Sequence, residues 1–177
     1  MLKIMDLSKF NVGTIISNHV KTLKNQEEDK YSLYDLGFSF IAPLIIAVLL
    51  SIFGHPISTS SVGVIVTAFS VFAAFLLNIL VVLFTMVERA KDGGNTQDTY
   101  NGDIKKTVIK ETYHNISFAL LLSIFIVVLT ILLILLPTIY FISNLIAGIG
   151  DFLIFIFIAT ILLILKRINA IISKEFT

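Results

Sequence analysis

The fold is decided by residues 62–87, which read VGVIVTAFSVFAAFLLNILVVLFTMV. This stretch contains no charged side chain and no proline. As an α-helix, at about 1.5 Å per residue, it would extend for about 39 Å, which exceeds the roughly 30 Å hydrocarbon core of a bilayer. Its apolar residues are continuous rather than alternating as in barrel strands, so we predict a membrane-spanning helix.

Three further apolar segments are long enough to cross a bilayer, namely Leu36–Phe53, Ile116–Leu136 and Leu145–Leu165. Of all 177 residues, 56% are hydrophobic and 14% are charged, and the mean hydropathy is +0.96. A soluble domain has about 25% charged residues, and a disordered chain lacks the apolar content. The sequence therefore predicts an all-α polytopic membrane protein, with four transmembrane helices arranged in two hairpins.

The distribution of positive charge predicts the orientation. All 13 Lys and Arg residues lie in the segments 1–35, 88–115 and 166–177, whereas the short turns at 54–61 and 137–144 contain none. Loops rich in Lys and Arg stay on the cytoplasmic side. We therefore predict a multi-pass membrane protein with cytoplasmic N- and C-termini.

This orientation divides the chain into five segments. They are a cytoplasmic amphipathic N-terminal segment at 1–35, a first transmembrane hairpin at 36–87, a cytoplasmic loop or stalk at 88–115, a second hairpin at 116–165, and a cytoplasmic tail at 166–177.

The N-terminal segment has the pattern of an amphipathic helix, because apolar residues recur near helical spacing at Val12, Ile15, Ile16, Val20 and Leu23. Such a helix can lie in the headgroup region or dock on a protein partner. The interpretation that we favour is a helix that covers the cytoplasmic end of the bundle. The lysines that are candidates for contact with the membrane surface or a partner are Lys21, Lys24, Lys105, Lys106 and Lys110. For the last three, a role as topology anchors is favoured.

Polar and small residues share one face of the second predicted span. Thr67, Ser70, Asn78 and Thr85 recur on that face, and Asn78 lies near the middle of the bilayer. Faces of this kind join helices in lipid, where each hydrogen bond contributes roughly 0.6–2 kcal/mol. The favoured interpretation is a helix contact, within the bundle or between copies of a homo-oligomer. The alternative is a polar constriction in an oligomeric pore.

Asp151 is the one acidic residue on the predicted external side, and two registers are open for it. If the last span begins at Leu145, Asp151 is buried and becomes a candidate ion or proton site, because intramembrane carboxylates are costly. If the helix begins at Asp151, the residue is an N-cap at the external interface. Gly148 and Gly150 favour the cap.

The sequence offers no pattern for catalysis. It has no cysteine, its three histidines are separated in the predicted topology, and it contains no phosphate loop, triad pattern or metal-ligand spacing. We therefore expect no enzyme activity, no catalytic or metal-binding residue and no cofactor. A net charge of +1 gives no reason to expect direct binding of nucleic acid.

Two segments resemble stretches of small four-helix bacterial membrane proteins associated with anti-phage defence. They are Thr67–Phe84, TAFSVFAAFLLNILVVLF, and Lys110–Ile124, KETYHNISFALLLSI. Some proteins of that kind damage membranes or anchor a cytoplasmic sensor. The resemblance implies an oligomeric effector or sensor subunit of the bacterial inner membrane that works with a cytoplasmic protein partner, and it transfers no functional residue.

Two other functions remain open at this point. The first is a small channel or transporter subunit with an ion path through Asn78 and Asp151. The second is a holin-like protein, which ranks lower because the tail carries few charges, namely Lys166, Arg167, Lys174 and Glu175.

Overall fold

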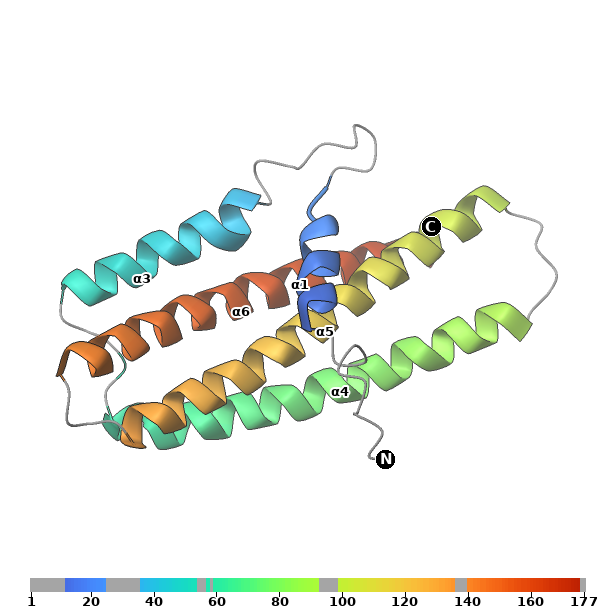
Figure 1. The fold of residues 1–177 in the computed structure, drawn as a ribbon. Helices are drawn as coiled ribbons and strands as arrows, with labels where there is room; N and C mark the ends of the chain where they lie inside the picture. Colours follow the sequence, from blue (N-terminus) through green and yellow to red (C-terminus); the bar gives the residue numbers. More distant parts are fainter. Residues whose placement is uncertain are drawn as a thin grey trace, which may run out of the picture.

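The computed structural model describes residues 12–24, 36–53, 57, 59–92, 99–135 and 140–175. Within these residues the chain is all-α and forms five α-helices (Figure 1). They are α1 (Val12–Lys21), α3 (Ala42–Ile52), α4 (Val62–Asp92), α5 (Thr99–Leu135) and α6 (Tyr140–Glu175). Two short helical turns, η2 (Gly37–Ile41) and η3 (Thr59–Ser61), precede α3 and α4.

Three of these helices are long and apolar enough to span a membrane. Their candidate spans are Val62–Glu88, Thr107–Leu135 and Asn144–Asn169. The predicted second, third and fourth spans are therefore confirmed as long apolar helices, and the protein is a multi-pass membrane protein.

The first predicted span is shorter than expected. The apolar helix covers Gly37–Ile52, which gives about 24 Å at about 1.5 Å per residue. Its first turn, η2, is a wide π-helical turn in which the Ala42 N–H bonds the Gly37 carbonyl. Pro43 follows directly, and because a proline ring crowds the carbonyl four residues back, the wider turn accommodates it. The four expected spans are thus three long helices and one short one.

The core lies along α5, which contacts both α4 and α6, while α3 packs against α6 (Figure 1). From α4, Phe69, Leu76 and Leu83 are buried at intervals of seven residues. The ring of Phe69 meets that of Phe157 on α6 edge to face, with centroids 4.9 Å apart. Because only this row of α4 side chains is buried, most of the surface of that helix is not covered by the other described residues.

The short helix α1 crosses the long helices steeply and packs against α5 (Figure 1). Its contact with α5 lies near the middle of that helix, at Asn115, and not at the end of the bundle that the sequence suggested (Figure 1). The rest of the predicted amphipathic segment, residues 1–11 and 25–35, lies outside the described residues.

Candidate functional site

A cluster of buried polar side chains joins α1 to the two central spans. We define the α1 docking cluster as His19 and Thr22 with Glu111 and Asn115 of α5 and Arg167 of α6. His19 and Asn115 are both 0% exposed. The His19 Nδ1–H donates to Asn115 Oδ1 over 2.8 Å. Thr22 Oγ1 lies 2.8 Å from the same Oδ1 and 2.7 Å from the His19 carbonyl, so its single proton serves one acceptor at a time.

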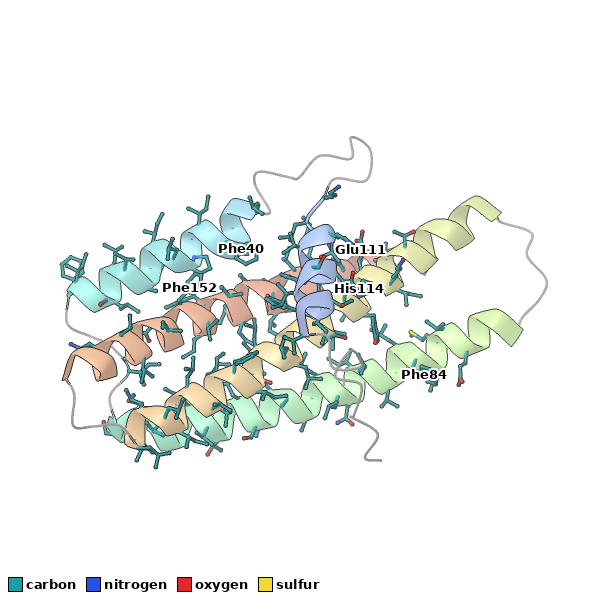
Figure 2. The ribbon with its side chains drawn as sticks, in the orientation of Figure 1. Phe40, Phe84, Glu111, His114 and Phe152 are labelled. Carbon is teal, nitrogen blue, oxygen red and sulfur yellow. The ribbon has the colours of Figure 1, made fainter. Side chains whose placement is uncertain are left out.

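The charged members of the cluster connect α6 to α1 and α5. Arg167 Nη2 donates to the Thr22 carbonyl over 2.6 Å and lies 3.4 Å from Glu111 Oε2. The turn that ends α1 is thus held by α5 through Asn115 and by α6 through Arg167. Figure 2 shows Glu111 and His114 on α5 beside α1. A carboxylate that pairs with Arg167 keeps this partly buried guanidinium compensated.

Two aromatic rings enclose the His19 imidazole. Phe118 of α5 stacks on it with centroids 3.9 Å apart and an interplanar angle of 11°. Phe40 of η2 meets it edge-on at 6.3 Å. This apolar burial is the main reason that the His19 pKa falls from 6.5 to about 4, and the nearby positive charge of Arg167 lowers it further, against the hydrogen bond to Asn115. At neutral pH the imidazole is therefore uncharged.

His19 Nε2 and Asn115 Nδ2, which are both buried in the cluster, have no hydrogen-bond partner among the described residues. In the neutral imidazole that donates through Nδ1, Nε2 is an acceptor, whereas the Asn115 amide nitrogen is a donor. Buried polar groups of this kind are costly, so the cluster binds α1 with less free energy than a fully paired one would.

The sequence did not predict this cluster. The expectation that the three histidines form no joint site gave His19 no role, and its partner Asn115 is 96 residues away along the chain. One local signal was present, because His19 falls on the apolar face of the predicted amphipathic helix, four residues after Ile15 and four before Leu23. A polar residue on a buried face requires a partner.

The structure places the polar candidates of the second span on the outside. Thr67, Ser70, Asn78 and Thr85 are all exposed on α4. Three of them donate to carbonyls of their own helix: Thr67 to Gly63, Ser70 to Val66 and Thr85 to Val82. Asn78 has no such bond in the described part of the chain.

Asp151 lies inside a helix, so the N-cap interpretation is wrong. α6 begins at Tyr140 and continues through both glycines, and Asp151 is 7% exposed. Gly150 serves close packing rather than helix termination, because a Cβ there would lie 3.0 Å from Ile57 Cδ1. Asp151 accepts a hydrogen bond from the Ile57 backbone, and its Oδ2 has no partner among the described residues.

One chain does not bring Asp151 and Asn78 together, because the first is buried beside Ile57 and the second faces outward. A path that used both would require another copy of the chain.

Of the candidate lysines, Lys21 and Lys110 are exposed on α1 and α5. Both lie near His114, so they share the side of the bundle where α1 docks. Lys24 is partly buried after α1, and the side chains of Lys105 and Lys106 lie outside the described residues.

The fold and this site together define a helical membrane protein with a small helix docked on its spans. Comparison with protein-family models, with curated proteins and with solved structures found no match. Among the residues that the structure describes, no group of three His, Asp or Glu side chains could hold a metal ion.

Proposed function

We propose that this chain is an effector or sensor subunit of the bacterial inner membrane, in which α1 receives a signal from a cytoplasmic protein partner. The observation that carries the proposal is the α1 docking cluster, which links a short helix outside the candidate spans to two helices within them. The resemblance of Thr67–Phe84 and Lys110–Ile124 to defence-associated membrane proteins favours a role in anti-phage defence.

The topology that goes with this proposal has four spans and cytoplasmic termini. In this topology the short helix Gly37–Ile52 is the first span, and its outward side chains are apolar and exposed, as lipid contact requires, namely Ile41, Leu44, Ile45 and Ile52. The short length of this helix is tolerated by local thinning of the bilayer. The absence of Lys and Arg from the two turns at the other end supports the same orientation.

The small size of α1 makes its docking reversible. It has 10 residues, and an isolated helix of that length is marginal in water. Its helical state therefore depends on contact with α5 and α6. Val12, Ile16 and Lys21 of this helix are all exposed, so apolar and positively charged side chains are both accessible to a partner.

In the proposed mechanism, a partner that binds α1 competes with the docking cluster. Release of α1 removes contacts with α5 and α6 together, so the packing of the spans changes and the membrane loses integrity. A signal shifts this equilibrium only by its differential affinity for the two states.

The experiment compares the membrane potential of cells that produce the wild-type chain, Asn115→Leu or Ser123→Ala. Asn115→Leu removes the acceptor shared by His19 and Thr22. Ser123 is also buried on α5 but donates to the Leu120 carbonyl of its own helix, which makes it the control. We expect depolarisation without any signal in Asn115→Leu alone.

Hydrogen exchange of residues 12–21 in the same membranes shows whether α1 is released. If α1 exchanges freely in Asn115→Leu while the potential equals that of the wild type, the proposed coupling is wrong.

A second candidate function rests on Asp151, which is a buried carboxyl group in a membrane helix with one oxygen unpartnered among the described residues. A channel or transporter subunit would use such a group to carry an ion or proton. In that case Asp151→Asn abolishes flux into liposomes while the protein still assembles. Flux equal to that of the wild type would exclude this function.

A further inference from the structure

The helix α4 is the least covered of the three long spans. Of the most apolar 18 residues in each, 11% are buried in α4, compared with 39% in α5 and 44% in α6. Its buried line of Phe69, Leu76 and Leu83 faces the core. At about 100° per residue, Asn78 points almost directly away from that line. The only amide side chain in this span is therefore turned toward whatever surrounds the chain.

The outward face of α4 has a regular spacing, and we call it the outer seam. Its positions are separated by four and three residues in turn, and all are exposed: Thr67, Val71, Ala74, Asn78, Val81 and Thr85. This alternation is the seven-residue repeat with which two parallel helices pack along each other. Small side chains at such positions let membrane helices approach closely.

Asn78 differs from the other polar residues of the outer seam. The hydroxyl groups of Thr67 and Thr85 bond carbonyls of their own helix, so neither needs an outside partner. The Asn78 amide has two donors and an acceptor, and the described part of the chain supplies a bond to none of them. An amide left unpaired in hydrocarbon costs several kcal/mol.

We propose that the outer seam is the contact between two copies of this chain, with the Asn78 side chains of the two copies hydrogen-bonded to each other. Two copies inserted in the same direction place Asn78 at the same depth by symmetry. An amide is both donor and acceptor, so it satisfies its own symmetry mate, whereas another protein would need a polar group at that depth by coincidence. The proposal depends on the membrane span of α4 and not on the proposed function.

The absence of cysteine from the chain permits a direct test in native membranes. Single cysteines are placed at two seam positions, Val71→Cys and Thr85→Cys, and at their exposed neighbours, Phe72→Cys and Phe84→Cys. Phe84, labelled in Figure 2, is 62% exposed but lies about 100° around the helix from Thr85. A disulfide forms only when the two Cα atoms come within about 7 Å.

We expect mild oxidation to give crosslinked dimers at both seam positions and little product at Phe72→Cys and Phe84→Cys. Equal crosslinking at seam and neighbouring positions, or none at the seam, would overturn the proposal.

A second measurement isolates the amide pair. Asn78→Leu should lower the association constant in detergent or lipid about 3- to 30-fold, from the usual strength of one interhelical hydrogen bond. Thr67→Val is the control, because that hydroxyl already bonds the Gly63 carbonyl, and it should change association little. Association of Asn78→Leu as tight as that of the wild type would show that the amide pair does not form.

Discussion

The polar side chains of the α1 docking cluster are buried or partly buried within the chain, whereas those of the outer seam of α4 are exposed. At the cluster, His19 and Asn115 are fully buried and bond to each other, and Arg167 of α6 donates to the Thr22 carbonyl. On α4 the polar side chains face outward, and Asn78 finds no bond in the described chain. The described chain thus supplies partners for polar side chains at the first site and none for Asn78 at the second. This difference underlies the two proposals, a reversible docking of α1 inside the chain and a contact between two copies at α4.

One large expected effect concerns the shared acceptor of the docking cluster. Asn115→Leu leaves the His19 Nδ1–H without Oδ1, and a buried donor without a partner costs about 1–3 kcal/mol, whereas the Thr22 hydroxyl keeps the His19 carbonyl as its acceptor. We expect docking of α1 to weaken by about 1–3 kcal/mol, measured as faster hydrogen exchange at residues 12–21. Ser123→Ala should leave this exchange unchanged, and protection of α1 in Asn115→Leu equal to that of the wild type would remove the cluster as the docking contact.

The next effect is acid release of α1. The His19 pKa is about 4 when α1 is docked and 6.5 in the free helix, so the free state binds the proton more tightly. Docking is therefore strongest above about pH 6.5, weakens by about 1.4 kcal/mol per pH unit below it, and levels off near pH 4, after a loss of about 3 kcal/mol.

Hydrogen exchange of α1 between pH 7 and pH 4, corrected for the intrinsic exchange rate, measures this slope. His19→Gln keeps an amide in place of the imidazole but does not titrate, so its profile should be flat by comparison. Identical profiles for the two proteins would assign the acid effect to other groups.

A smaller effect tests the close approach at the other end of α6. Gly148→Ala meets nothing within 4 Å and should stabilise the helix by about 1 kcal/mol. Gly150→Ala places a Cβ 3.0 Å from Ile57 Cδ1, so part of the same gain is lost in moving that side chain. Thermal unfolding in detergent should rank Gly148→Ala above Gly150→Ala, and the reverse order would contradict the packing described for Ile57.

The smallest effect compares the two regions directly. Asn78→Leu changes an outward side chain, so docking of α1 should shift by less than about 0.5 kcal/mol. The measurement is again exchange at residues 12–21. A loss like that of Asn115→Leu would mean that the outer seam and the docking cluster are coupled, and the contrast between them would fail.

Continuous apolar runs were enough to predict α4, α5 and α6, because a membrane helix has to satisfy its own backbone. Two features could not be predicted in this way. Gly148 and Gly150 are typical helix breakers in isolation, and only the approach of Ile57 shows why glycine is used inside α6. His19 and Asn115 are brought together by tertiary packing, which no pattern within either segment encodes. Asn78 was recognised from the sequence, but its outward direction required the structure.

The docking cluster holds α5 near the middle of its length. The helix runs without interruption for 37 residues, or about 56 Å, and Asn115 lies about 30 Å from its end at Leu135 and about 24 Å from its start at Thr99. A tilt of about 10° around the cluster would move the Leu135 end of α5 by about 5 Å, nearly one helical turn, and the Thr99 end by about 4 Å in the opposite direction. The crossing of α1 over α5 is thus a pivot, at which a change in the tilt of one helix displaces both of its ends.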